Sequence, residues 1–108
     1  MRLAIAPFEK IANGDKNIES RLYDEKRQRI NIGDQIEFIC KDDLSKKILT
    51  KVKAIYLYSS FEELFSDFSP EKFGGNSKQE LIKEVNKFYL DEEQQKYNAV
   101  GIKIELIK

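Results

Sequence analysis

The sequence predicts an α+β domain built on a small mixed or antiparallel β-barrel of about five strands with flanking helices. Several segments alternate apolar and polar residues with the period of two that is typical of strands. Other segments repeat apolar residues at the spacing of a helix face. The chain of 108 residues contains no internal repeat and no linker rich in Pro or Gly, so we expect a single domain over residues 1–108.

The N-terminal part of the chain is expected to run from strand to helix to strand. Residues 3–6 are a short apolar segment, and Pro7 suits the first turn of a helix because that position needs no backbone N–H. The pair Asn13-Gly14 is expected to end this helix. From there residues 17–22 alternate as a strand with one apolar and one charged face.

The middle of the chain predicts two further strands. Residues 33–34 form a Gly-Asp turn, and the alternation over residues 35–41 indicates a strand near the sheet centre. Residues 42–45 are expected to form a hairpin connection. Residues 46–58 are rich in β-branched and aromatic side chains and predict one long strand.

The C-terminal part predicts helices and a last strand. Ser59 or Ser60 is expected to cap a helix whose apolar side chains pack against the barrel, namely Phe61, Leu64, Phe65 and Phe68. After a flexible turn at Gly74-Gly75, residues 77–80 match a capping box and begin a second helix. A last helical turn is expected over residues 91–97, followed by a terminal strand over residues 99–107.

The composition excludes several classes of function. Lys and Arg number 19, Asp and Glu number 19, and the zero net charge argues against bulk attraction to DNA or anionic lipid. With no His and only Cys40, no zinc site of Cys and His and no Ser-His-Asp triad can form, and we expect neither metal nor cofactor. No apolar run approaches the roughly 20 residues of a membrane span, so we expect a soluble protein without membrane contact. A lone Cys fits the reducing cytoplasm.

The most unusual stretch is Gly14 to Arg21, which reads G-x-K-x-x-E-x-R. Lys16 lies in the expected turn, and Glu19 and Arg21 share one face of the strand that follows. A carboxylate beside a guanidinium, with an ammonium nearby, can hold a phosphate or a polar heterocycle in a fixed orientation. The alternative is a solvated ion pair at the surface, which contributes little to stability. The half of the chain with this motif also holds the surplus of basic residues.

Residues 7–21, together with residues 24–28 and 30–38, resemble the ASCH domain family, named for homology to an activating signal cointegrator. The recurring signature of that family is the same G-x-K-x-x-E-x-R, followed by a Gly-Asp turn and a hydrophobic strand. Residues 97–104 resemble the closing strand of its small bacterial members. The resemblance implies a small β-barrel, similar to the PUA domain of RNA-modifying enzymes, with a charged cleft beside the first helix.

The resemblance further implies an RNA or nucleotide-like ligand. Lys16 and Arg21 would contact phosphate or the acceptor edge of a base, while Glu19 would accept from an exocyclic amine or hold Arg21 in place. Lys26 and Arg27 would extend the basic strip along a strand backbone. The alternative for residues 24–27 is a set of ion pairs that neutralise one another.

Two other functions stay open at this point. Some small bacterial members of the family are amidohydrolases of N4-acetylcytidine, with a motif threonine as nucleophile where this chain has Glu19. Lys16 and Glu19 are therefore only alternative catalytic candidates. Those members also carry a further glutamate before the later helix. The corresponding residues 73–76 of this chain contain no carboxylate, although Glu71 is near. A third possibility is a protein-interaction adaptor whose acidic C-terminal half contacts a basic partner.

Overall fold

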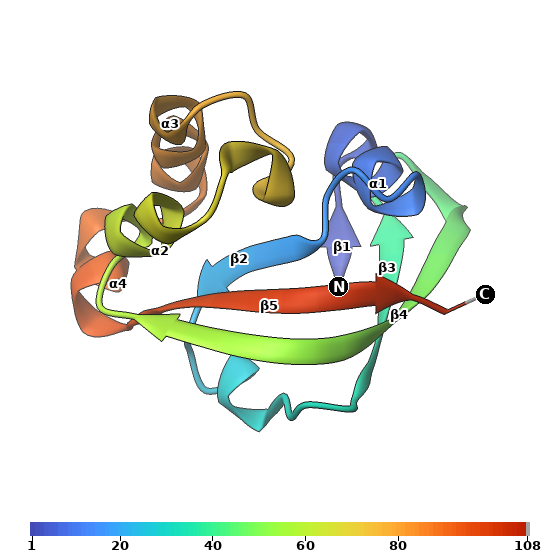
Figure 1. The fold of residues 1–108 in the computed structure, drawn as a ribbon, viewed down its shortest axis with the longest axis horizontal. Coiled ribbons are helices and arrows are strands. Elements are labelled where there is room, and N and C mark those ends of the chain that lie inside the picture. The colour runs from blue at the N-terminus through green and yellow to red at the C-terminus, as the bar shows by residue number, and fades with distance from the viewer. Residues whose placement is uncertain (108) are drawn as a thin grey trace.

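The computed structural model describes residues 1–107, whose five-stranded sheet curls into a half-barrel (Figure 1). The strands are β1 (Arg2–Leu3), β2 (Ile18–Leu22), β3 (Gln35–Cys40), β4 (Asp43–Tyr58) and β5 (Ala99–Leu106). The α-helices are α1 (Ile5–Ala12), α2 (Phe61–Asp67), α3 (Lys78–Phe88) and α4 (Asp91–Lys96). Two short 3₁₀ turns are η1 (Arg27–Arg29) and η2 (Pro70–Phe73). The predicted α+β barrel with flanking helices is confirmed.

The sheet is mixed, with strand order β1-β3-β4-β5-β2. Only β1 and β3 are parallel, and the other neighbours are antiparallel. The long strand β4 pairs with both β3 and β5, and its register against β5 shifts between Val52 and Ala54. Such a bulge bends a strand, which helps the sheet to curl. The edge strands β1 and β2 are not paired with each other, so the half-barrel is open between them.

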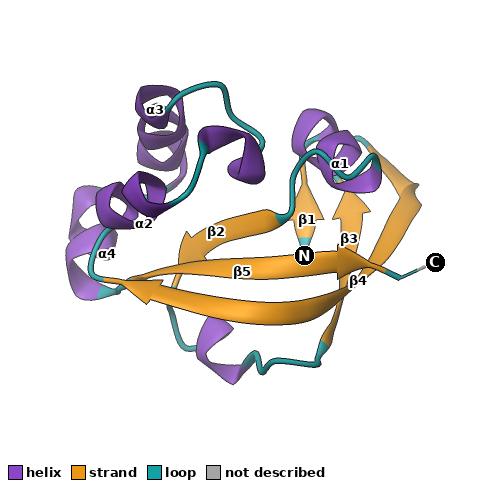
Figure 2. Cartoon of the chain, in the orientation of Figure 1, coloured by secondary structure: helices purple, strands orange, loops and turns teal. Residues whose placement is uncertain are grey.

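The helices cover the sheet in two groups. Figure 2 shows α1 near one end of the curled sheet and α2, α3 and α4 at the other end, with β2 running between them. One apolar core fills the half-barrel beneath α1 and includes Phe38 and Ile102. The other lies between β2 and the helical group and includes Ile18, Leu64 and Val85. Strand β2, which carries the charged motif, therefore lies between the two cores.

The predicted helix caps are present. Ser60 Oγ accepts a hydrogen bond from the Glu63 N–H at 3.2 Å, and Ser77 Oγ accepts one from the Glu80 N–H at 3.1 Å. Each bond satisfies one of the N–H groups that a helix start leaves without a partner. The helix after Ser60 ends at Asp67, so Phe68 packs beyond it.

The prediction for the central hairpin was wrong in its bounds. Strand β4 begins at Asp43 rather than at Lys46, because Asp43 pairs with Cys40 across the turn. The connection is therefore shorter than the expected residues 42–45. The strand predicted over residues 35–41 is confirmed as an interior strand and ends at Cys40, although β4 lies at the sheet centre.

Within residues 1–107, none of the helices combines the length and the apolar character needed to pass through a bilayer.

Candidate functional site

The end of α1 places Lys16 beside Lys10. Gly14 has a φ of +87°, a left-handed conformation that glycine adopts without strain, and it reverses the chain. The Lys16 N–H then donates to the Lys10 carbonyl at 2.9 Å. The predicted turn is confirmed, and it directs the Lys16 side chain back toward the sheet.

Three motif side chains form one connected cluster. Lys16 Nζ donates to Glu19 Oε1 at 2.7 Å. Arg21 Nε donates to the other oxygen, Glu19 Oε2, at 2.8 Å, and the Arg21 terminal nitrogen lies 2.8 Å from the same oxygen. Both carboxylate oxygens are therefore engaged, and the plane of the guanidinium is held in one orientation.

This cluster is not a solvated surface pair. The Glu19 side chain is only 4% exposed, and those of Lys16 and Arg21 are 8% and 18% exposed. In the β2 register Glu19 lies opposite Ile102 and Arg21 lies opposite Val100, two residues of the core within the half-barrel. Residues directly opposite each other share a face, so the charged face of β2 points into the barrel.

The charges around Glu19 determine its protonation. Burial acts to raise the pKa of Glu19, but the charges of Lys16 and Arg21 and their hydrogen bonds outweigh burial and hold the pKa below its usual 4.5. Glu19 is therefore an anion at neutral pH. With two cations and one anion, the cluster keeps a net positive charge.

Arg21 also reaches across the opening of the half-barrel. Its terminal nitrogen donates to the Arg2 carbonyl of β1 at 3.4 Å. The Met1 carbonyl accepts from the Ile39 N–H and the Leu3 carbonyl from the Lys41 N–H, so the Arg2 carbonyl between them faces away from β3. One side chain of the motif thus connects the two free edges of the sheet.

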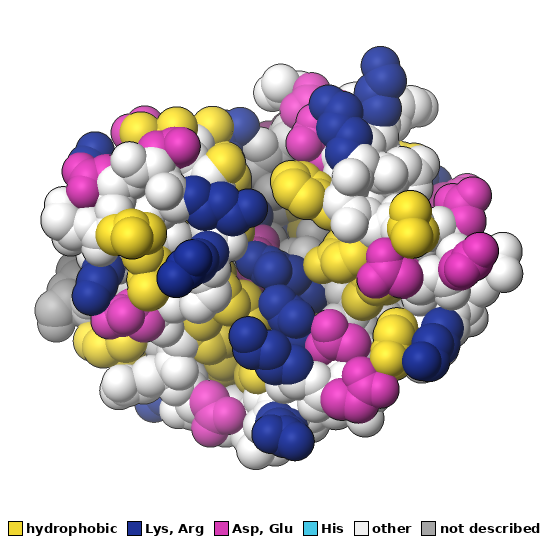
Figure 3. All heavy atoms as spheres, turned by 180° about the vertical axis from the view of Figure 1, so that it is seen from behind, with side chains coloured by type: hydrophobic (Ala, Val, Ile, Leu, Met, Phe, Trp, Pro, Cys, Tyr) yellow, Lys and Arg dark blue, Asp and Glu magenta, His cyan; other side chains and the backbone are white. Residues whose placement is uncertain are grey.

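The cluster lies in a cleft of about 540 Å³ between α1, β2 and α3. Figure 3, which shows the molecule from behind, has a hollow between two raised lobes in which Lys and Arg side chains gather. Basic residues of the lining are Arg2, Lys10, Lys16, Arg21 and Lys41. The facing wall is apolar and acidic, with Leu81, Val85, Phe88, Tyr89, Glu80 and Glu84 from α3 and its end. The basic wall of this cleft can hold an anionic group, and the two aromatic rings of the facing wall can contact a flat ring next to it.

Comparison with known proteins assigns the family. The family model for the ASCH domain matches residues 1–108. The chain belongs to the ASCH domain family. The resemblance predicted from the signature is thereby confirmed. A search of curated protein sequences found no match.

Solved structures show the same fold. The crystal structure of hypothetical protein PH0355 is 39% identical to this ASCH domain, with a TM-score of 0.84 over 99% of this chain and 96% of that one. The solution structure of protein PF0455 from Pyrococcus furiosus is 33% identical, with a TM-score of 0.74 over 100% and 99% of the two chains. An ASCH protein from Zymomonas mobilis, at 15% identity and a TM-score of 0.67, covers 97% of this chain and 64% of its own, and agrees in fold.

The cleft of this ASCH domain does not include Lys26 or Arg27, since neither residue lines it. Arg27 pairs with Asp24 at 3.1 Å, so part of the charged insert neutralises itself, as one alternative expected. Lys26 is exposed in the same loop. That these two residues extend the basic strip stays a prediction.

Sequence reasoning missed several residues of the cleft. Arg2 lies on β1, Lys10 on α1 and Lys41 in the turn after β3, and no motif spacing connects them. Phe88 ends α3 and Tyr89 follows it, and Phe88 is exposed at the cleft, with Lys41 Nζ 5.8 Å from its ring centre. Only the folding of α3 over the open edge of the barrel brings these residues together.

The glycine pair before α3 is a site of close packing rather than a flexible turn. Gly74 has a φ of +83°, and its carbonyl accepts from Lys10 Nζ at 2.5 Å. A Cβ at this position would lie 3.1 Å from Lys16 Cδ and 3.3 Å from Lys10 Cδ. The missing side chain therefore lets both lysines lie under the loop, and Gly74 fixes their positions.

We expect Gly74→Ala to lower the free energy of unfolding more than Gly33→Ala. Both glycines have positive φ, so each alanine introduces a backbone penalty of about 1–2 kcal/mol. At Gly33 nothing lies within 4 Å of the added Cβ, whereas at Gly74 the two lysines must also move. The difference should be about 1 kcal/mol in urea unfolding. Equal losses in the two variants would contradict the packing role of Gly74.

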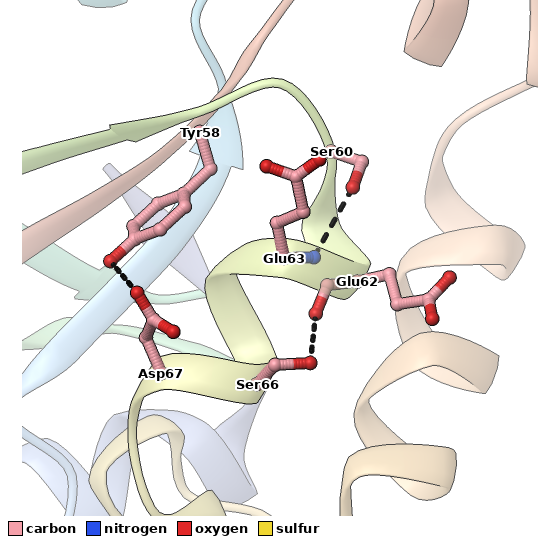
Figure 4. Close-up of a pocket in the computed structure, with 6 residues that line it drawn as sticks. All are labelled: Tyr58, Ser60, Glu62, Glu63, Ser66 and Asp67. Carbon is pink, nitrogen blue, oxygen red and sulfur yellow. Dashed lines mark hydrogen bonds between the residues drawn. The ribbon is translucent and has the colours of Figure 1, made fainter.

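A second hollow lies at the start of α2, and its polar groups bind one another (Figure 4). Tyr58 donates to Asp67 at 2.6 Å, and Ser66 donates to the Glu62 carbonyl at 2.8 Å. Its lining residues include three carboxylates and neither Lys nor Arg. Such a surface repels phosphate, so the cleft at the motif is the better candidate site. Residues 1–107 bring no three His, Cys, Asp or Glu side chains together as a metal site.

Proposed function

We infer that the cleft binds RNA or a nucleotide-like ligand through Lys16, Glu19 and Arg21. The observation that carries this proposal is the convergence of the three side chains on one cleft, with Glu19 holding the Arg21 guanidinium in place. The ASCH family is generally considered RNA-binding-like, which supports the same ligand class. Arg21 is partly exposed and offers its remaining donors to a phosphate or to a base acceptor.

The cations of the cleft that lack an acidic partner supply the attraction. Among the ion pairs of residues 1–107, none involves Arg2, Lys10 or Lys41. These three cations surround a hollow whose opposite wall carries Phe88 and Tyr89. Phosphate on the basic side and a base against the aromatic side is the arrangement that fits this cleft.

The hydrolase alternative gains no support from the geometry. A general base works best with a pKa near the operating pH, whereas Lys16 and Arg21 hold the pKa of Glu19 below its usual value. Both Glu19 oxygens already accept hydrogen bonds, and Glu71 does not line the cleft. Glu19 is suited to orienting Arg21 rather than to activating water.

We expect Arg21→Ala to weaken binding of a short single-stranded RNA of mixed sequence about tenfold, because charge-assisted hydrogen bonds are lost. The matched control is Arg29→Ala, which removes an exposed arginine outside the cleft and should leave the affinity unchanged. Fluorescence anisotropy measures the affinities, and circular dichroism verifies that each variant is folded. Equal affinities for the wild type and Arg21→Ala would reject the site.

The salt dependence of RNA binding should be shallow. If Arg2, Lys10 and Lys41 each contact one phosphate, the logarithm of the association constant should fall against the logarithm of salt concentration with a slope of about −2. Titrations at several KCl concentrations measure this slope. A slope steeper than about −4 would require phosphate contacts beyond the cleft, for which Lys26 and Arg27 are the candidates.

A further inference from the structure

The motif strand β2 leaves some of its backbone groups free. It lies at the edge of the sheet and pairs only with β5. The Tyr23 N–H donates to the Asn98 carbonyl at 2.7 Å, and the Ile104 N–H donates to the Asn17 carbonyl at 2.9 Å. In an antiparallel ladder the backbone groups of alternate residues bond to the partner strand. The N–H and C=O groups of the odd-numbered residues of β2 therefore point toward β5. The N–H and C=O groups of Ile18, Ser20 and Leu22 therefore point away from the sheet.

Ser20 is the one of these three residues that lines the cleft. Ile18 and Leu22 are buried in the core beneath the helices and do not line it. Over residues 1–107, no backbone group of a neighbouring segment bonds to the Ser20 N–H or carbonyl. The cleft thus holds one backbone donor and one backbone acceptor, directly beside the cluster of Glu19 and Arg21.

The Ser20 N–H and C=O together favour one kind of ligand. In an extended residue the N–H and the C=O point to the same side, so a flat ring edge with an acceptor next to a donor can bond to both. The Watson–Crick edges of nucleobases have this arrangement, and RNA-binding proteins read bases through these edges. A peptide strand would need several consecutive free residues for pairing, whereas Ser20 alone faces the cleft.

We propose that the Ser20 backbone reads the Watson–Crick edge of a single nucleobase in the cleft. This inference rests on the proposed function, in which the cations around Arg21 hold a phosphate. It deepens that function, because the cations attract any nucleotide whereas a paired donor and acceptor discriminate between base edges. The Ser20 hydroxyl has no part in the recognition.

The test uses the full chain with AMP, CMP, GMP and UMP, each titrated by isothermal titration calorimetry. The mononucleotide that binds best is then compared with its form methylated at the ring nitrogen of the Watson–Crick edge. We expect methylation to weaken binding about tenfold, as for the loss of a two-bond base contact. In ¹⁵N-labelled wild-type protein, the Ser20 amide resonance should shift when the unmethylated nucleotide is added.

Two substitutions at Ser20 form a matched pair. Ser20→Pro removes the free N–H together with the hydroxyl, whereas Ser20→Ala removes the hydroxyl alone, and proline is tolerated on an edge strand where its nitrogen faces away from the ladder. Ser20→Pro should bind the mononucleotide about tenfold more weakly than Ser20→Ala, since only the proline variant lacks the N–H. If Ser20→Pro does not fold, the methylated nucleotide and the Ser20 amide resonance still decide the question.

The outcomes separate this inference from the proposed function. If no mononucleotide binds, or if methylation leaves both the affinity and the Ser20 resonance shift unchanged, base reading by Ser20 is overturned. Binding of the short RNA that still depends on Arg21 would leave the proposed function standing in either case. If Arg21→Ala also has no effect on RNA binding, both proposals are overturned.

Discussion

Replacing Glu19 with glutamine is expected to lower the free energy of unfolding by about 3–5 kcal/mol, the usual loss when one partner of a buried ion pair is removed. Glu19 accepts from Lys16 at 2.7 Å and from Arg21 at 2.8 Å, and both cations would be left without a carboxylate in a buried place. Urea unfolding followed by circular dichroism measures the change. Binding of RNA should weaken as well, since Arg21 loses its orientation.

The control for this variant is Glu105→Gln, on the outer face of β5 opposite Lys51. An exposed substitution of this kind should change the free energy of unfolding by less than about 0.5 kcal/mol. Similar losses in the two variants would contradict the account of Glu19 as the buried centre of the cluster.

The pH dependence of stability should differ between the wild type and Glu19→Gln. The pKa of Glu19 lies below its usual 4.5 in the folded protein, so folding favours the charged form. This contribution is fully present above pH 4.5 and is lost as the pH falls through the lower folded pKa. The stability difference between wild type and variant should therefore shrink in acid. A difference that stays constant from neutral pH down into strong acid would contradict the assignment.

The second large effect is expected for Leu64→Ala, which should lower the free energy of unfolding by about 2–5 kcal/mol. Leu64 is fully buried where α2 packs against β5. The contact is so close that a Cβ added to Gly101 would lie 2.9 Å from Leu64 Cδ1. Truncation therefore leaves a cavity at the base of the helical group that forms one wall of the cleft.

Leu57→Ala is the matched control, because Leu57 is 50% exposed on β4. We expect its loss to stay below about 1 kcal/mol, since little apolar area leaves a packed environment. Thermal unfolding of both variants measures the difference. If Leu64→Ala lowered the stability as little as Leu57→Ala, the Leu64 side chain would not be what holds α2 on the sheet.

Local signals in the sequence predicted most elements of the fold. The caps at Ser60 and Ser77 depend on side chains within one turn, and both are present as expected. Alternation predicted the strands because one face of each packs on a core. The bounds of β4 were wrong because the tight turn between Cys40 and Asp43 is set by pairing across the sheet, which alternation does not report.

For the candidate site, the sequence predicted the motif residues but not their burial. The motif predicted Lys16, Glu19 and Arg21 as site residues because they lie within a few residues of each other, on one turn and the strand that follows. Their burial was not predicted, since a charged strand face normally points to water. Here β2 lies at the open edge of the half-barrel, so its charged face points inward against Val100 and Ile102.

The sequence by itself determined the fold class, the family and the three charged residues, because each follows from local spacing and from a compact motif. Only the tertiary structure decided what surrounds them. Lys10, Lys41 and Tyr89 come from different parts of the chain, and Gly74 brings a distant loop onto Lys10 and Lys16. The free backbone of Ser20 also depends on strand order, because a residue's N–H and C=O are exposed only where no neighbouring strand pairs with them.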